Sequence, residues 1–246
     1  MSEYTMLADW VDSPYYQLLS SEENKGRTDF INDLLAHLQP AENSKLLNAA
    51  CNTGKVCFEL AKKGFDVTGL DLSCLLVKDA KQHELENLQF FQHDIRLPFW
   101  INYFDYAFNL FSNFGHYKTI REHDNAIRVI SQSLKTAGLF VLDYINVHFE
   151  EEHIEKNTEK LVDNQHFFLT KWQDAETFYT QIQLKQADIT RELYTDRSLK
   201  LSIGDFTDMF AYQGLQIQEV FGDYNFADYN IRTSPRLIII ARKIRR

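Results

Sequence analysis

The sequence is poor in cysteine, glycine and proline. Its three cysteines, Cys51, Cys57 and Cys74, are odd in number and have no CxxC spacing, so we expect neither a disulfide framework nor a zinc knuckle. With 9 glycines and 4 prolines in 246 residues, a collagen-like or loop-dominated chain is excluded. No run approaches the roughly eighteen apolar residues of a membrane-spanning helix, and the N-terminal segment lacks a signal-peptide pattern. We therefore expect a protein without membrane segments, in the reducing cytoplasm.

Positive charge is also scarce. Lys and Arg together number 26 against 35 Asp and Glu, a formal net charge of −9. Such a chain lacks the cationic surface that sequence-independent nucleic-acid binding requires, so we expect no nucleic-acid partner. By contrast, 19 phenylalanines and 12 tyrosines indicate an aromatic core or an aromatic-lined pocket.

Strands and helices alternate through the first two thirds of the chain. After a helical stretch that ends near residue 39, apolar runs predict strands at 45–51, 65–72, 88–92, 104–111 and 139–145. Helical patterns fall between them at 56–63, 73–84 and 121–135, with Ser73 as an N-cap and Gly138 as the end of the third. This alternation predicts right-handed crossovers and a parallel sheet covered on both faces.

The pattern changes after residue 147. Polar and apolar residues roughly alternate at 165–173, 177–186, 189–194 and 198–203, which predicts an antiparallel sheet with one wet face. A helix at 204–214 and strands at 215–220 and 236–243 then complete the chain. An insertion of this length is too long for a plain connection, so we interpret it as a functional lid or subdomain.

The turn after the first strand is the expected ligand floor of an open parallel sheet. It runs from Asn48 to Gly54, and Asp71 ends the second strand. A carboxylate at that place can accept two hydrogen bonds from a ribose diol. Alternatively, Asp71 only caps the helix that follows.

Five segments in order, LLNAACNTG, FDVTGLDLS, FFQHDI, FDYAFNLFSNFGHY and LKTAGLFVLDYIN, resemble the motif set of class I S-adenosylmethionine-dependent methyltransferases. The resemblance covers residues 45–146, and the ending FGDYNFADYNIRTSPRLIIIARK is similar to the last two strands of small-molecule members. It implies an α/β fold: a Rossmann-like, doubly wound, mostly parallel sheet with an antiparallel last strand, plus an inserted antiparallel β lid. The implied single domain comprises a helical cap at 1–40, a cofactor-binding core at 41–146, the lid at 147–203 and a C-terminal part at 204–246.

The resemblance also implies roles for individual residues. S-adenosylmethionine would be the cofactor and S-adenosylhomocysteine the product, with the turn facing the methionine part, Asp71 on the ribose and Asp94 at the adenine amino group. The implied cofactor-binding residues are Tyr16, Asn48, Ala50, Cys51, Asn52, Gly54, Asp71, Leu72, Asp94, Ile95, Asn109, Leu110 and Phe111. A small-molecule acceptor, methylated on O or N, would lie among Tyr15, Phe114, His116, Tyr144 and Asn146.

Several of these assignments have a structural alternative. His116 is the candidate general base, but a histidine at this place can equally be a structural one. The aromatic residues of the insertion, including Phe167 and Trp172, either close over the acceptor or form the insertion's own small core. His148 and His153 are five residues apart, on different faces of a helix, so we expect no metal site. The sequence does not predict an oligomeric state.

The turn departs from the family pattern of one acidic residue and three glycines. Asn48 stands for the acid, Ala50 and Asn52 stand for two glycines, and only Gly54 is kept. Weak cofactor binding would leave a methyltransferase-like binding or scaffolding module, which is the alternative function. A nicotinamide-dependent oxidoreductase is a third, less favoured because the turn lacks GxGxxG.

Overall fold

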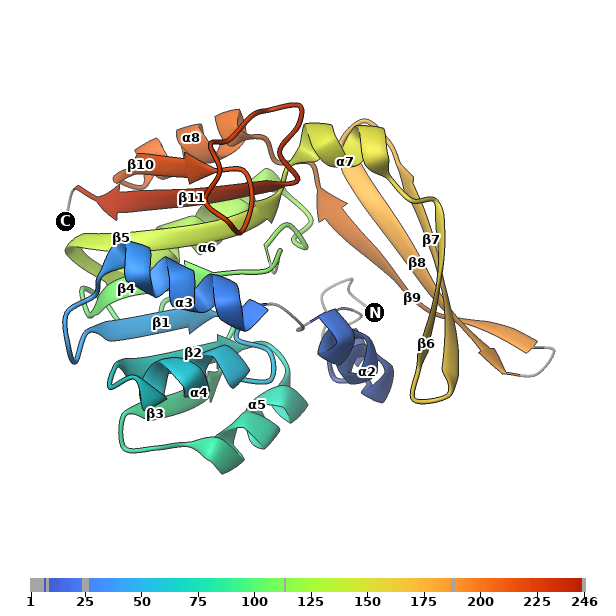
Figure 1. Cartoon of the computed structure of the whole chain (residues 1–246), viewed down its shortest axis with the longest axis horizontal. Coiled ribbons are helices and arrows are strands. Elements are labelled where there is room, and N and C mark those ends of the chain that lie inside the picture. Colours follow the sequence, from blue (N-terminus) through green and yellow to red (C-terminus); the bar gives the residue numbers. More distant parts are fainter. Residues whose placement is uncertain (1–6, 8, 24–26, 113, 187–188, 245–246) are drawn as a thin grey trace.

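The computed structural model describes residues 7, 9–23, 27–112, 114–186 and 189–244. Its main sheet has seven strands in the order β10-β11-β5-β4-β1-β2-β3 (Figure 1). In chain order these are β1 (Lys45–Ala49), β2 (Asp66–Asp71), β3 (Leu88–Gln92), β4 (Phe104–Asn109), β5 (Leu134–Ile145), β10 (Leu215–Phe221) and β11 (Arg236–Lys243). β11 runs antiparallel to both of its neighbours, and β1 to β5 pair in parallel. The predicted mostly parallel sheet with an antiparallel last strand is confirmed.

Helices cover both faces of this sheet (Figure 1). On one face, α3 (Arg27–Leu38), α4 (Lys55–Lys62) and α5 (Cys74–Ala80) share an apolar cluster with the sheet. On the other, α6 (Ile120–Ser133) and α8 (Ile203–Tyr212) contribute to a second cluster. A short 3-10 turn, η1 (Lys81–His83), follows α5. The two clusters arise because the central strands are buried on both faces, as expected for a parallel sheet covered by helices.

The place where a ligand should bind follows from this order. β1 lies between β2 and β4, so successive crossovers leave it in opposite directions. Ligands of open α/β sheets bind beyond the carboxyl ends of the strands at such a switch point. The turn after β1 and the ends of β2 and β4 therefore surround the expected site.

The boundary between α6 and β5 differs from the prediction. The helix ends at Ser133, and β5 begins at once with Leu134, which pairs with Phe104. Ala137 has a φ of 68°, and the register shifts between Phe104 and Tyr106. Gly138 therefore lies in a bulged strand rather than at the end of the helix. A bulge disturbs the alternation of side chains on which strand prediction depends.

A second, antiparallel sheet follows α7 (Val147–His153) and has the order β6-β7-β8-β9. β6 (Asn157–Val162) was not predicted, because only Val162 of this edge strand is buried. β7 (Gln165–Gln173) and β8 (Thr177–Gln186) lie as expected. β9 (Ile189–Leu199) was predicted as two strands but is one, since Thr195, Asp196 and Arg197 all pair with β8.

The N-terminal segment lies between the two sheets. Helix α2 (Pro14–Glu23) stands beside the inner face of the second sheet (Figure 1). Trp10 and Leu19 form an apolar cluster there with Phe167, Leu169 and other residues of β6 to β8. α3, also within the predicted cap, packs instead on the main sheet. Among the described residues, no helix has the length and apolar character to cross a membrane.

Candidate active site

A pocket of about 650 Å³ lies beyond the carboxyl ends of the main-sheet strands. Its wall includes the turn after β1, the ends of β2 and β5, the inner face of the second sheet and the N-terminal segment with Trp10 and Tyr16. Its volume falls within the range of about 300–1,000 Å³ for small-molecule and cofactor sites. The pocket thus joins the expected ligand floor to the inserted sheet.

The turn after β1 has an unusual backbone. Ala50, Asn52 and Gly54 have φ values of 61°, 52° and 74°, all in the left-handed region that favours glycine. Gly54 also has no space for a side chain, because a Cβ there would lie 2.7 Å from the Phe90 ring. Asparagine tolerates this conformation better than alanine does. The turn therefore keeps the shape of a glycine-rich loop with fewer glycines, and Ala50 is its strained position.

Replacing Ala50 by glycine should stabilise the protein. An alanine in the left-handed conformation destabilises the folded state by roughly 1–2 kcal/mol, and glycine removes this cost. Part of the gain, about 0.5–1 kcal/mol, is lost because glycine makes the unfolded chain more flexible. We expect Ala50→Gly to raise the free energy of unfolding by about 0.5–1 kcal/mol in urea titrations. Ala49→Gly is the matched control, because Ala49 is a buried residue of β1 and should lose stability. A destabilised Ala50→Gly variant would show that Ala50 is not strained in the folded protein.

Asp71 lies at the end of β2 and lines the pocket. Its Oδ2 accepts a hydrogen bond from the Asn52 backbone N–H at 2.7 Å, and its Oδ1 accepts one from Ser73 N–H at 3.0 Å. Burial raises the pKa of this carboxyl, and the N–H donors oppose the rise. These two bonds use about half of the acceptor positions of a carboxylate, so Asp71 can still accept from a diol.

The alternative role of Asp71 as the helix cap is filled by other side chains. The N-cap of α5 is Ser73, whose Oγ accepts the Leu76 N–H at 3.1 Å, as predicted. Asp12 of the N-terminal segment also accepts the Leu75 N–H at 3.2 Å and hydrogen-bonds Ser73 Oγ. Apart from the bond that it accepts from the N-cap residue Ser73, the carboxylate of Asp71 is thus left for the turn and the pocket.

His116 also lines the pocket and connects the loop after β4 to strand β9 of the second sheet. Its Nδ1 is 3.1 Å from Asp196 Oδ1 of β9, and its Nε2 is 3.2 Å from the Ser112 carbonyl oxygen. Burial alone would lower its pKa, but the charge and hydrogen bond of Asp196 and the Ser112 carbonyl together raise the pKa to about 9. Both ring nitrogens face acceptors, so His116 is a cation at neutral pH. This arrangement does not favour a general base, which needs a neutral ring.

The His116–Asp196 pair predicts a pH dependence of stability. The folded pKa of about 9 lies above the ordinary value of 6.5. The contribution of the pair is therefore fully present below about pH 6.5 and lost as the pH rises through 9. Because these side chains are 31% and 26% exposed, we expect about 1–3 kcal/mol rather than more. The difference in unfolding free energy between wild type and His116→Gln should shrink by that amount from pH 6 to pH 10. A constant difference would contradict the ion pair.

The structure brings together about half of the site residues that the sequence indicated. Those in the pocket wall are Tyr16, Ala50, Asn52, Asp71, Leu72, Asp94, Ile95, Phe111 and His116. The others are not part of the wall: Tyr15, Asn48, Cys51, Gly54, Asn109, Leu110, Phe114, Tyr144 and Asn146. Whether the first group binds cofactor stays a prediction.

The residues outside the wall have structural partners. Asn48 Nδ2 donates to Cys57 Sγ at 3.4 Å, and Asn109 Nδ2 donates to the Ala49 carbonyl at 3.1 Å. Cys51, Leu110 and Phe114 belong to the apolar clusters, and Tyr15 packs edge-on against Phe167. Asn48 and Asn109 do lie near the carboxyl ends of β1 and β4, but successive side chains of a strand point to opposite faces of the sheet, so not all of them reach the pocket.

Tyr144 and Asn146, which the resemblance placed at the acceptor, are fully buried braces. The Tyr144 hydroxyl donates to the Leu199 carbonyl and lies 3.2 Å from Ser198 Oγ. Asn146 Nδ2 donates to the Ser234 carbonyl at 2.7 Å, and its Oδ1 accepts from Tyr229 at 3.1 Å. These two side chains fix the base of the second sheet and the loop before β11 rather than line the pocket.

Sequence reasoning missed the pocket-lining Arg236, at the start of β11. Its Nε is 2.9 Å from Oδ1 of Asp143, a fully buried carboxylate of β5, and its Nη2 donates to Ser112 Oγ at 2.7 Å. An aspartate within the apolar run LFVLDYI is the signal that could have indicated a buried ion-pair partner. Trp10 and Asp196 also line the pocket, and no local motif marks them.

Comparison with known proteins agrees with this geometry. A family model described as "Methyltransferase domain" matches residues 40–214. The putative methyltransferase YqeM of Bacillus subtilis is 30% identical over 105 residues, which is 42% of each protein.

Solved structures extend the likeness to nearly the whole fold. A S-adenosylmethionine-dependent methyltransferase from Clostridium acetobutylicum superposes with a TM-score of 0.76 at 14% identity, covering 94% of this chain and 99% of that one. CalS10, an amino pentose methyltransferase from Micromonospora echinaspora solved with S-adenosylmethionine bound, gives 0.73 at 19% identity, covering 94% and 97%. Since the family model spans well over half of the chain, the protein belongs to the methyltransferase domain family.

Proposed function

We propose that this protein transfers the methyl group of S-adenosylmethionine to a small-molecule acceptor held between the main sheet and the second sheet. The observation that carries the proposal is the single pocket wall that unites Asp71, the left-handed turn and the inner face of the second sheet. A nucleoside would bind at the turn and Asp71, and an acceptor would bind at the inner face of the second sheet. The family membership supplies the reaction class.

The residues present fit the cofactor. Asn52 Oδ1 is buried without a hydrogen-bond partner among the described residues, and it lies in the turn expected to face the cofactor's amino-acid end. A buried acceptor without a donor costs roughly 1–3 kcal/mol, which an ammonium group would offset. Asp71 would hold the ribose hydroxyls, and Leu72 and Ile95 offer apolar contacts for the adenine, with Asp94 at their side.

The chain's own task in the reaction is alignment. When bound, S-adenosylmethionine supplies an electrophilic methyl group, and the transfer is an in-line displacement that needs orientation and the exclusion of water. Phe178 and Ile182 of the second sheet and Trp10 of the N-terminal segment enclose the acceptor side of the pocket. These apolar side chains keep water away from the reacting atoms.

The state of His116 bears on the acceptor. As a cation with both nitrogens facing acceptors, His116 is not available to remove a proton. A neutral amine carries a lone pair and needs no base before it attacks, whereas an alcohol has to lose its proton. This favours an N-methyl acceptor over an O-methyl acceptor, and the amino pentose that CalS10 is named for is a compound of this kind.

Methyl-labelled S-adenosylmethionine tests the proposal directly. The protein is incubated with pairs of small sugars that differ only in an amine or a hydroxyl at one carbon, and both labelled product and S-adenosylhomocysteine are measured. We expect acceptor-dependent turnover, at least about tenfold faster for the amine. Equal rates for both members would contradict the amine preference. Cofactor binding without turnover on any acceptor would favour the binding module.

The cytoplasmic location is a prediction of the same proposal.

A further inference from the structure

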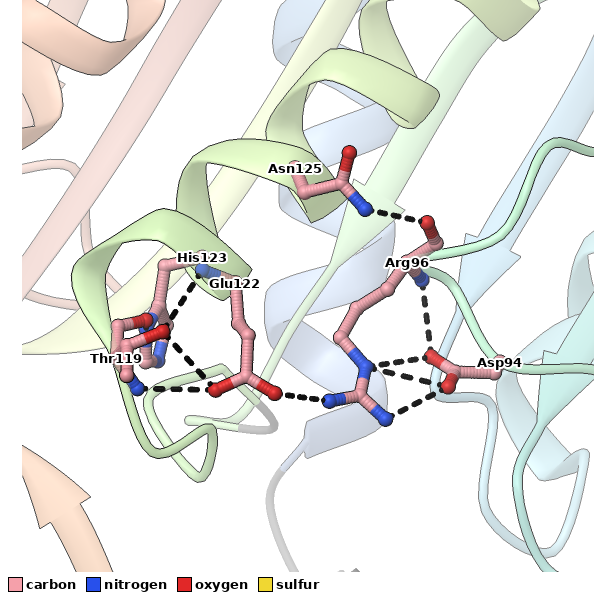
Figure 2. A network of polar contacts seen from close by, with 6 residues as sticks. All are labelled: Asp94, Arg96, Thr119, Glu122, His123 and Asn125. Atoms are coloured by element: carbon pink, nitrogen blue, oxygen red, sulfur yellow. Dashed lines mark hydrogen bonds and ion pairs between the residues drawn. The ribbon is translucent and has the colours of Figure 1, made fainter.

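Arg96 stands directly behind the part of the pocket wall formed by residues 93–95. Asp94 lines the pocket, and Arg96 does not. The guanidinium donates hydrogen bonds to both oxygens of the Asp94 carboxylate: Nη2 lies 2.8 Å from Oδ2, and Nε lies 3.1 Å from Oδ1 (Figure 2). The Arg96 backbone N–H donates to the same Oδ1 at 2.9 Å. This two-point geometry fixes the plane of the carboxylate as well as its position.

The arginine is itself anchored to helix α6. Its Nη1 is 2.5 Å from Glu122 Oε1, and its carbonyl oxygen accepts from Asn125 Nδ2 at 2.7 Å (Figure 2). Glu122 in turn belongs to the capping box of α6, where its Oε2 accepts from the Thr119 N–H at 3.1 Å. The chain of contacts thus runs from a rigid helix end, through one guanidinium, to one carboxylate in the pocket.

Burial strengthens the dependence of Asp94 on Arg96. The side chains of Arg96 and Asp94 are 17% and 12% exposed, so neither charge is well solvated and each depends on the other. The guanidinium also lies 4.9 Å from the centre of the Tyr117 ring, another pocket residue. Contacts with Asp94, Glu122 and the Tyr117 ring therefore hold the guanidinium in place.

The position of Asp94 matches a particular donor. Ile95 and Leu72 give this part of the wall an apolar surface, and Asp71 lies at the end of the neighbouring strand. A nucleoside whose ribose is held by Asp71 would place its base along this surface. An amino group on the edge of the base would then meet the Asp94 carboxylate.

We propose that Arg96 is a positioning residue that aligns the Asp94 carboxylate and thereby gives the site its preference for the adenine amino group. The inference rests on the proposed function, since it needs the cofactor in this pocket. Arg96 does not touch the cofactor in this account. It acts through Asp94, so its removal should affect recognition of one substituent more than binding as a whole.

The test compares two ligands by isothermal titration: S-adenosylhomocysteine and its purine analogue, in which hydrogen replaces the adenine amino group. In wild type we expect the amino group to improve affinity roughly 10- to 100-fold, the value of a hydrogen bond to a charged acceptor. In Arg96→Met this ratio should fall below about threefold, with a smaller change in the affinity for the analogue. Arg96→Lys keeps a charge but loses the two-point geometry, so it should give an intermediate ratio.

Arg121→Met is the matched control. Arg121 is an exposed arginine on the same helix and stands outside the pocket wall, so its loss should leave the ratio unchanged. An unchanged ratio in folded Arg96→Lys or Arg96→Met would overturn the inference. If wild type binds neither ligand, the proposed function fails before Arg96 is tested, so the two failures are distinct.

Discussion

Asp71→Ala should reduce the affinity for S-adenosylhomocysteine at least about 100-fold. Two hydrogen bonds from ribose hydroxyls to a carboxylate contribute roughly 1.5–3 kcal/mol each before desolvation. Asp71 is the carboxylate at the end of β2 that lines the pocket, and backbone N–H groups hold its orientation. Isothermal titration of the variant against wild type measures the loss.

Two controls separate binding from folding in this experiment. Asp71→Asn keeps an acceptor oxygen for only one of the two backbone N–H groups, so it should fold with a modest loss of stability and still lose most of the affinity. Asp66→Ala removes a carboxylate from the other end of the same strand, where Asp66 pairs with Lys45, and should bind normally. Wild-type affinity in a folded Asp71→Ala variant would remove Asp71 from the ribose site.

Arg236→Met should destabilise the fold by about 3–5 kcal/mol. The substitution leaves the fully buried Asp143 carboxylate without its cation, and an uncompensated buried charge costs this much. Asp143 Oδ2 also accepts the Phe111 N–H at 2.7 Å and the Tyr224 hydroxyl at 3.0 Å. The loop that begins at Phe111 and carries His116 should therefore shift, and turnover should fall with stability.

Urea unfolding of Arg236→Met beside Arg242→Met checks this expectation. Arg242 lies on the same strand but is exposed, so its loss should change the free energy of unfolding by less than about 0.5 kcal/mol. Equal effects of the two substitutions would show that the Asp143–Arg236 pair contributes no more than a surface charge.

The architecture was predictable because it repeats a simple pattern. Gly64 marks the end of the helix that follows β1, and Ser73 marks the start of the helix that follows β2. Ser73 caps α5 as expected. Where local rules conflict with pairing, the prediction failed. Gly138 is typical of a helix end, yet Leu134 pairs with Phe104 and draws the segment into β5.

The site was less predictable, because it is built from side chains far apart in the chain. The sequence indicated His116, which does line the pocket, but its charge state depends on Asp196, eighty residues later. It also indicated Asp94, but the orientation of that carboxylate depends on Glu122 through Arg96. Conversely, Tyr144 and Asn146 follow the rule for strand ends and still point into the core. Sequence spacing gives the strand on which a residue lies, whereas packing decides what its side chain contacts.

The central claim is that a turn with one glycine in place of three still forms a working cofactor site. Titration of the wild-type protein with S-adenosylhomocysteine tests it most directly. One molecule should bind per chain at micromolar concentration, and Ala50→Gly should bind at least as tightly. Absence of heat at millimolar ligand, in both wild type and Ala50→Gly, would contradict the account.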